Sequence, residues 1–123
     1  MTLPDWAGYL RFRPLLAAAL DPAFYPIEYL DDLLRSGRPR LFVSGGAAMV
    51  AELRLYPGGA RAVHCLVAAG RMDEITGVLR PEAEAWGRAN GCTIAIVESR
   101  AGWAKLLKPH GYAPHQIALL KSL

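Results

Sequence analysis

The sequence predicts an α/β fold of the α+β type, with a mixed central sheet and the element order α-α-β-β-β-α-β-α-β. Two changes in hydrophobic period indicate this class: residues 40–69 alternate in the manner of strands, and residues 72–90 carry apolar side chains at helical spacing. A short apolar run over residues 92–97 then follows. An antiparallel region that passes through a long helix into a buried strand favours a parallel pair with a right-handed connection. A length of 123 residues with 53% hydrophobic residues predicts one domain, residues 1–123.

Two helices are predicted ahead of the first strand. Residues 1–8 have no clear period and are expected to form an irregular arm, after which a first helix spans residues 14–20. A second helix spans residues 26–35 and ends where Gly37 can adopt a left-handed conformation. Its expected apolar stripe contains Ile27, Leu30 and Leu34, and its acidic residues Glu28, Asp31 and Asp32 are expected to face solvent.

Residues 40–69 are predicted to form a three-stranded antiparallel meander. The turns fall at the glycine-rich residues 44–46 and 57–59. A three-residue loop at 57–59 sets the register of the second hairpin, and this register places Glu52 opposite His64.

The C-terminal half is predicted to contain a long helix, a buried strand, a short helix and a last strand. The long helix covers residues 72–90, and Pro81 is expected to kink it because the apolar stripe continues in phase across the proline. Residues 92–97 lack alternation, which favours a central parallel strand covered on both faces. Ser99 can cap a short helix that ends by Pro109, and residues 117–120 form the last strand.

Composition excludes several classes of protein. A net charge of +3 is too small to indicate nucleic-acid binding, and no apolar run approaches the ~18 residues of a membrane span. We therefore expect a soluble, cytoplasmic protein. Cys65 and Cys92 have no neighbouring cysteine in a metal-binding motif, and the three histidines lack ligand spacing, so no metal site is predicted.

Three short segments, in this order and spacing, resemble the GNAT superfamily of N-acetyltransferases. They are Val-His-Cys-Leu-Val at 63–67, Ala-Trp-Gly-Arg-Ala-Asn-Gly-Cys at 85–92 and Leu-Leu-Lys-Pro-His-Gly-Tyr at 106–112. The resemblance covers residues 25–123 and implies a short, divergent member with a trimmed C-terminus. It also extends loosely to GNAT-like proteins encoded by phages and prophages.

The resemblance implies an acyl-CoA-dependent N-acyltransferase, in which a small-molecule or peptide amine attacks acetyl-CoA directly. The cofactor would lie between residues 63–69 and residues 92–98, with contacts from Val67, Ala69, Gly70 and Arg71. Glu98, Ser99 and Arg100 follow the parallel strand at the end where ligands commonly bind, although helix capping and surface exposure also explain them.

Two departures from the family favour a second hypothesis. Asp73 and Glu74 stand where the family has a glycine-rich phosphate loop, and Leu107 stands where many members have a catalytic tyrosine. Tyr112 matches the core aromatic residue that follows the family's glycine. The alternative is therefore a non-catalytic binding or assembly module in which acetyl-CoA binds weakly or no longer binds, and the sequence leaves open whether the chain is an enzyme.

If chemistry is retained, Glu52 and His64 are the candidate general base, because a carboxylate orients an imidazole and raises its pKa. The simpler explanation is a charged cross-strand pair on a solvated face. The apolar residues 117–120 predict an exposed sheet edge, which favours a homodimer completed through this strand. The alternative is that residues 1–10 fold back and cover this edge.

Overall fold

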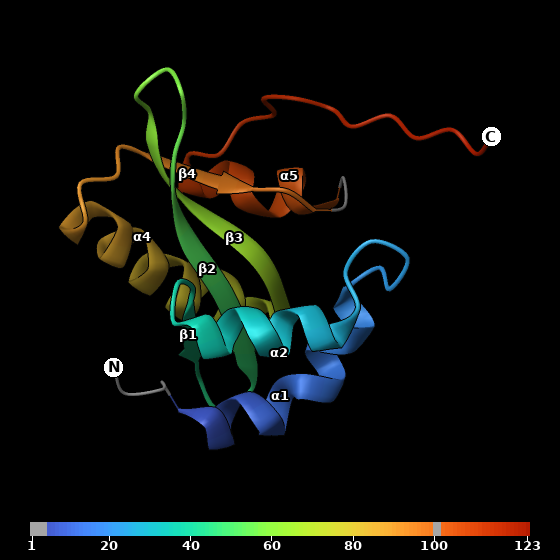
Figure 1. Cartoon of the computed structure of the whole chain (residues 1–123). Helices are drawn as coiled ribbons and strands as arrows, with labels where there is room; N and C mark the ends of the chain where they lie inside the picture. The colour runs from blue at the N-terminus through green and yellow to red at the C-terminus, as the bar shows by residue number, and fades with distance from the viewer. Residues whose placement is uncertain (1–4, 100–101) are drawn as a thin grey trace.

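The computed structural model describes residues 5–99 and 102–123 and confirms a mixed α+β architecture (Figure 1). Its strands form one sheet in the order β1-β2-β3-β4, in which β3 and β4 are parallel and the other pairs are antiparallel. The elements in chain order are α1 (Trp6–Ala19), α2 (Ile27–Ser36), β1 (Arg40–Val43), β2 (Ala47–Leu55), β3 (Arg61–Gly70), α3 (Met72–Glu74), a π-helical segment (Ile75–Leu79), α4 (Arg80–Ala89), β4 (Ile94–Val97), α5 (Gly102–Leu107) and a 3-10 turn (Lys108–His110).

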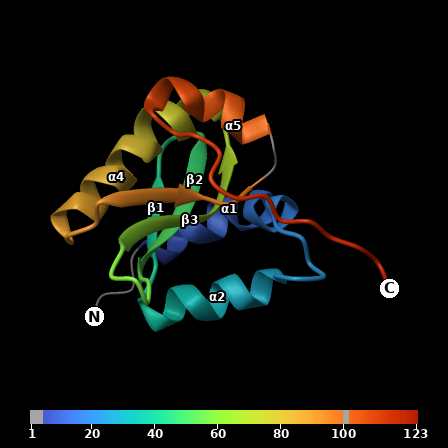
Figure 2. The ribbon, with the colours of Figure 1, turned by 90° about the horizontal axis from the view of Figure 1, so that it is seen from above.

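Helices cover both faces of the sheet (Figures 1 and 2). On one face, Tyr9, Phe12 and Leu16 of α1 pack with residues of α2 and the inner strands. On the other face, Ile75 and Leu79 pack on Met49 and its neighbours in the sheet. The predicted three-stranded antiparallel meander is confirmed. Because helices pack on both of its faces, the sheet has a hydrophobic core on each side.

The first helix begins earlier than predicted. Asp5 caps it, with its Oδ1 accepting a hydrogen bond from the Gly8 N–H at 2.9 Å, so the irregular arm expected for residues 1–8 is wrong from residue 6 onward. Residues 1–4 lie outside the described part of the chain. Pro14 lies inside the helix on its exposed side, where water can bind the carbonyl oxygen that loses its N–H partner. The spacing of the buried residues 9, 12 and 16 explains why the helix continues through the proline.

The second helix matches its prediction except at Asp31. Gly37 ends it with a φ of 77°, as expected. Asp31 is buried instead of solvent-facing, because the guanidinium of Arg13 donates to both of its carboxylate oxygens, at 2.9 and 2.6 Å, and the Tyr9 hydroxyl donates a third hydrogen bond. This network joins α1 to α2 and holds the pKa of Asp31 below its usual range, chiefly through the hydrogen bonds from Arg13.

The long helix passes Pro81 without stopping, as predicted, but it does so through a π-helical segment. Residues 75–79 wind more widely, and the Arg80 N–H bonds the Ile75 carbonyl oxygen. Proline lacks an N–H, and its ring crowds the carbonyl group four residues earlier. The wider turn immediately before Pro81 relieves that crowding.

The strand β4 is parallel to β3, as predicted, but the expectation that it is central and covered on both faces is wrong. It is an edge strand, it begins at Ile94 and not at Cys92, and Ile94 is 42% exposed. No residue from 112 to 123 belongs to a helix or strand, so the predicted last strand over 117–120 does not form within this chain. Residues 6–10, the alternative cover for that edge, belong to α1 and pack on the opposite side of the molecule from α5 (Figure 1).

Among the described residues, none of the helices has the length and hydropathy of a membrane-spanning segment.

Candidate functional site

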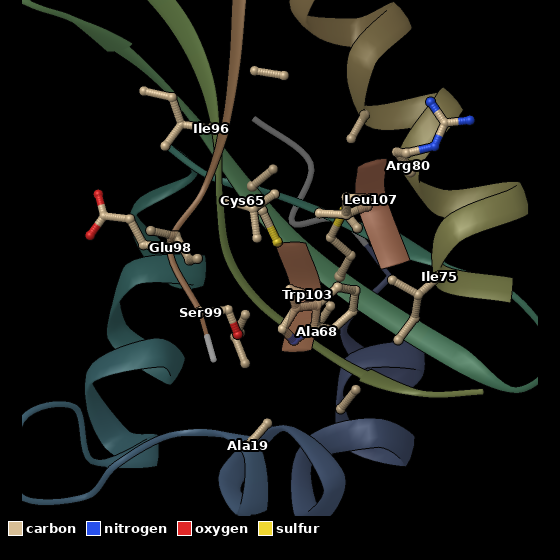
Figure 3. A pocket seen from close by; sticks show the side chains of 18 of the residues that line it. Ala19, Cys65, Ala68, Ile75, Arg80, Ile96, Glu98, Ser99, Trp103 and Leu107 are labelled. Atoms are coloured by element: carbon tan, nitrogen blue, oxygen red, sulfur yellow. The ribbon is translucent and has the colours of Figure 1, made fainter. Parts of the chain in front are cut away.

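A cavity of about 640 Å³ opens where β3 and β4 stop pairing (Figure 3). The two strands pair from Ala62 with Ile94 to Cys65 with Val97, after which β3 continues to Gly70 without a neighbour on this side. The long helix and α5 line one side of the cavity, and the loop between α1 and α2 contributes Tyr25 to the lining. This size and this largely apolar lining are typical of ligand sites.

A β-bulge in β3 lies at the point where the cavity opens. Val67 pairs with Val50 and Cys65 pairs with Ala51, so Leu66 between them has no partner of its own. The bulge resets the alternation of the side chains, so that Val67 and Ala69 pack toward α1. The candidate cofactor residues Val67, Ala69 and Gly70 lie in the half of β3 that pairs with β2 but has no strand on the β4 side, and they line the cavity.

Cys65 lines the same cavity, and its thiol is a poor nucleophile. Burial raises the pKa of the Cys65 thiol to about 12, and the backbone N–H of Val67 offsets part of this increase. The thiol is therefore protonated at neutral pH, whereas the thiolate is the nucleophilic form.

The first turn of the long helix is occupied by carboxylates from the chain itself. Glu74 Oε1 accepts hydrogen bonds from the Ser44 hydroxyl at 2.6 Å and the Gly46 N–H at 2.8 Å. The Arg71 guanidinium lies 3.2 Å from Glu74 and 3.3 Å from Asp73. Arg71, a candidate phosphate contact, is thus already paired with two carboxylates.

These interactions also explain the charge state of the acidic pair. The Ser44 hydroxyl, and then the Gly46 amide, hold the pKa of Glu74 below its usual range. The hydrogen bond from Arg71 lowers the pKa of Asp73 in the same way. Both carboxylates are therefore negative at neutral pH, at the helix terminus where an anionic ligand would otherwise bind.

The predicted register of Glu52 and His64 is found in the structure, but each side chain has a different partner. Glu52 Oε1 accepts a hydrogen bond from Arg54 Nε at 2.7 Å, whereas His64 Nε2 lies 2.9 Å from Glu98 Oε1. His64 is only 4% exposed, and Glu98 lines the cavity from the end of β4. Arg100, the third residue of the predicted segment 98–100, lies outside the described residues.

His64 also has a polar atom without a partner. Within residues 5–99 and 102–123, its Nδ1 is the one buried side-chain nitrogen or oxygen that lacks a hydrogen bond. The arrangement fits the tautomer with hydrogen on Nε2, which donates to Glu98. A bare nitrogen lone pair then faces the interior, where an unpaired N–H would be a lost donor. The side-chain pair of Glu52 with His64 that the sequence predicted does not form; the carboxylate that contacts His64 is Glu98.

A second polar group that the sequence did not indicate lies on the helix side of the cavity. Glu84 Oε2 accepts hydrogen bonds from Arg80 Nη1 at 2.8 Å and from the Tyr112 hydroxyl at 2.9 Å. Burial, followed by the bond to Glu84, raises the pKa of Tyr112. The four-residue spacing of Arg80 and Glu84 on a helix could have predicted their ion pair from the sequence. The hydrogen bond from Tyr112 could not be predicted in this way, because it joins residues that are 28 positions apart. Leu107 lines the cavity with an apolar side chain.

The described residues contain no group of three or more histidine, cysteine, aspartate or glutamate side chains that could hold a metal ion.

No protein-family model and no curated protein matches the chain by sequence. Solved structures match its fold. The aminoglycoside N-acetyltransferase AAC(6')-Iy in complex with CoA gives a TM-score of 0.72 at 13% identity, over 97% of this chain and 90% of that one. Glucosamine-6-phosphate N-acetyltransferase from Arabidopsis thaliana gives 0.67 at 14% identity, over 99% and 94%. Ribosomal-protein-alanine N-acetyltransferase from Brucella melitensis biovar Abortus 2308 gives 0.66 at 17% identity, over 95% and 94%.

The resemblance to phage-encoded proteins stays a prediction, as does location in the cytoplasm. The order of the elements, the parallel β3–β4 pair that separates at a bulge and the structural matches agree with one another. The chain has the fold of the GNAT N-acetyltransferases.

Proposed function

We propose that this chain is an acyl-CoA-dependent N-acyltransferase that uses the cavity between β3 and β4. The observation that carries the proposal is the separation of these parallel strands at the bulge, which leaves a cavity of about 640 Å³. A slender thioester arm can enter such an opening and bond the unpaired edge of β3 in the manner of an added strand. One structure of the same fold is a complex with CoA.

The reaction proceeds by direct attack. The amine nitrogen attacks the thioester carbonyl carbon, and the N–H of Val67 donates to the oxygen on which negative charge develops. The carbon–sulfur bond then breaks, which leaves an amide and a thiolate. Cys65 takes no covalent part, because its raised pKa keeps it protonated.

Proton transfer uses the pair at the end of β4. Glu98 accepts the proton of the attacking amine, and His64 orients the carboxylate through the 2.9 Å contact. The sequence predicted an imidazole base on His64 that Glu52 orients; the proposed mechanism reverses these roles, with the Glu98 carboxylate as the base and His64 as the group that orients it. The departing thiolate is protonated by water, and the water recovers the proton that Glu98 took from the amine, which restores the carboxylate. The Tyr112 hydroxyl is already hydrogen-bonded to Glu84, and Leu107 has no acidic hydrogen.

The cofactor is bound mainly through its thioester arm. Val67 and Ala69 contact this arm, and Gly70 and Arg71 lie toward the diphosphate. The charge of Arg71 is balanced by Asp73 and Glu74, so the diphosphate gains little there. Acetyl-CoA therefore binds weakly, and S-acetylpantetheine, which lacks the nucleotide, binds with similar affinity.

The decisive experiment measures thiol release from acetyl-CoA and from S-acetylpantetheine in the presence of a panel of primary amines. Glu98→Gln is expected to lower the rate about 100-fold or more, because it removes the general base. Glu82→Gln, an exposed glutamate of the long helix outside the cavity, is the matched control and keeps the wild-type rate.

The competing hypothesis, a binding or assembly module that has lost the cofactor, rests on Asp73 and Glu74. It is supported if calorimetry detects binding of neither thioester to the wild-type chain.

A further inference from the structure

The cavity between β3 and β4 is lined from both faces of the sheet. Glu98 contacts His64, and the side chain of His64 points to the opposite face from its neighbour Val63, which packs beneath the long helix. Glu98 therefore lies toward α2, whereas Cys65 lines the cavity beneath the long helix and α5. Figure 3 shows Glu98 on one side of the cavity and Leu107 on the other.

The part of the cavity beneath the long helix, here called the inner chamber, is bordered by short side chains. Its lining includes Cys65, Ala68, Ile75, Ala83, Ala95 and Leu107. Four of these six residues are alanine or cysteine, although the layer between a sheet and its helix is normally close-packed. The Cys65 thiol, whose raised pKa of about 12 keeps it protonated, also behaves as a small apolar group. The short side chains therefore leave the inner chamber open.

The polar groups at the border of the inner chamber are already paired. Glu84 accepts hydrogen bonds from Arg80 at 2.8 Å and from Tyr112 at 2.9 Å. Within residues 5–99 and 102–123, none of the chamber's side chains has a buried nitrogen or oxygen atom without a hydrogen bond. An apolar space that a protein leaves unfilled lowers its stability, and such spaces take up apolar molecules in preference to water. A hydrocarbon chain therefore suits the inner chamber better than a polar group does.

We propose that the acyl donor carries a medium chain of about eight carbons, and that this chain binds in the inner chamber. The proposal rests on the proposed function, since it places the thioester carbonyl group at the Val67 N–H between the separated strands. The amine approaches from the face that holds Glu98, and the acyl chain extends to the opposite face. The two groups therefore do not compete for space.

The length of the chain follows from the walls of the chamber. Ile75 and Ala83 border it from positions about two turns apart on the long helix, which corresponds to roughly 11 Å. An extended octanoyl chain is of similar length. The reaction is unchanged, because the amine nitrogen still bonds the carbonyl carbon and the carbon–sulfur bond still breaks, now with an octanoyl group in place of an acetyl group.

The test compares thioesters of pantetheine that differ only in the acyl chain. Calorimetry measures the binding of the acetyl, butyryl, hexanoyl, octanoyl and dodecanoyl compounds to the wild-type chain. Burial of each methylene group is expected to raise the affinity by up to about fourfold, so the octanoyl compound should bind at least about 100-fold more tightly than the acetyl compound. The heat capacity change should become more negative over the same series. The dodecanoyl compound exceeds the chamber and should gain nothing further.

Two substitutions fill the inner chamber from different walls. Ala95 is partly exposed on β4, so Ala95→Leu has room to extend into the space, and Ala83→Leu does the same from the long helix. In each variant the octanoyl compound is expected to lose most of its advantage over the acetyl compound. Ala85→Leu, on the exposed side of α4, is the matched control and should keep the full advantage. Melting temperatures identify a variant that fails to fold, and the other wall then provides the test.

The possible outcomes separate this proposal from the proposed function. If the acetyl compound binds and longer chains bind no more tightly, the inner chamber holds no acyl chain, while the acyltransferase proposal stands. If no thioester binds, both proposals are wrong. A chain-length gain that survives both filling substitutions places the chain elsewhere. Free octanoate that binds as tightly as the octanoyl thioester would identify a fatty-acid pocket and overturn the assignment to an acyl donor.

Discussion

The carboxylate of Glu74 lies 2.6 Å from the hydroxyl of Ser44, and this contact ties the first turn of the long helix to the turn between β1 and β2. The same carboxylate accepts the Gly46 N–H. The carboxylate of Glu74 is therefore bound by the β1–β2 turn, and it places a negative charge beside the helix start, where an anionic ligand would otherwise be favoured.

The acidic pair is expected to weaken the binding of acetyl-CoA. The double variant Asp73→Asn/Glu74→Gln removes two negative charges near the diphosphate and frees the charge of Arg71. Calorimetry should then show acetyl-CoA binding about tenfold more tightly. S-acetylpantetheine, which has no diphosphate, is the internal control, and an equal gain for both ligands would contradict the electrostatic explanation.

Filling the cavity should abolish thioester binding. Ala68 lines the cavity on β3 and is partly exposed, so Ala68→Phe places a ring in the opening; because Ala68 also borders the core beneath the long helix, the melting temperature of the variant is measured alongside its affinity. We expect at least about a tenfold loss of S-acetylpantetheine affinity by calorimetry. Ala85→Phe, on the exposed side of α4, makes the same change outside the cavity and should have no effect. Unchanged binding in the Ala68 variant would place the ligand elsewhere.

The buried network of Asp31 is expected to stabilise the packing of α1 on α2. Asp31→Asn leaves Arg13 without its charged partner and should lower the free energy of unfolding at pH 7 by about 1–3 kcal/mol in urea titrations. Asp32→Asn is the control, because Asp32 is exposed and its contact with Arg35 at 3.2 Å lies on the surface. Surface ion pairs contribute little to stability, so this variant should resemble the wild type.

The contribution of Asp31 should also depend on pH in one direction. The pKa of Asp31 is lowered by folding, so its stabilising effect is fully present above the unfolded-state pKa and is lost as the pH falls through the folded-state pKa. The stability difference between wild type and Asp31→Asn should therefore be large at pH 7 and shrink below pH ~4. A difference that stays constant down to pH 2 would show that the charge of Asp31 is not the stabilising feature.

Gly70 is expected to tolerate no side chain. Its φ of 111° is unfavourable for other residues, and a Cβ atom there would overlap the carbonyl oxygen of Gly46. Gly70→Ala should therefore destabilise the fold by about 2 kcal/mol or more. Gly77→Ala makes the same change in the long helix, where a Cβ atom meets nothing within 4 Å, and should raise the melting temperature slightly. Equal melting temperatures for the two variants would contradict this comparison.

Local signals in the sequence were sufficient for much of the architecture. The loop at 57–59 has a length that sets the pairing of β2 with β3, so the partnership of Glu52 with His64 across the hairpin could be predicted from residue spacing. Gly37 marked the end of α2, and the continuous apolar stripe indicated a helix that passes Pro81. In each case the decisive interaction joins residues that are close in the sequence.

The side-chain partners of Asp31 and Glu98 could not be predicted in this way. Asp31 is buried because Arg13, 18 residues earlier, reaches it from α1. Glu98 takes the place of Glu52 because the parallel pairing sets His64 beside Ile96, which brings the end of β4 to the imidazole ring. Neither partnership has a local spacing that a single sequence displays.

The sequence by itself determined the second helix, the antiparallel meander with its register and the helix that passes Pro81, because each depends on short-range backbone and turn chemistry. Only the tertiary structure shows that β4 lies at an edge of the sheet and that residues 112–123 form neither a helix nor a strand. The apolar run Ile-Ala-Ile-Val is compatible with a central strand and with an edge strand. Hydrophobicity indicates that a segment packs against other parts of a protein, but it does not indicate which element packs against it. Only the packing of the chain shows that, among residues 5–99 and 102–123, no strand lies beside the outer edge of β4.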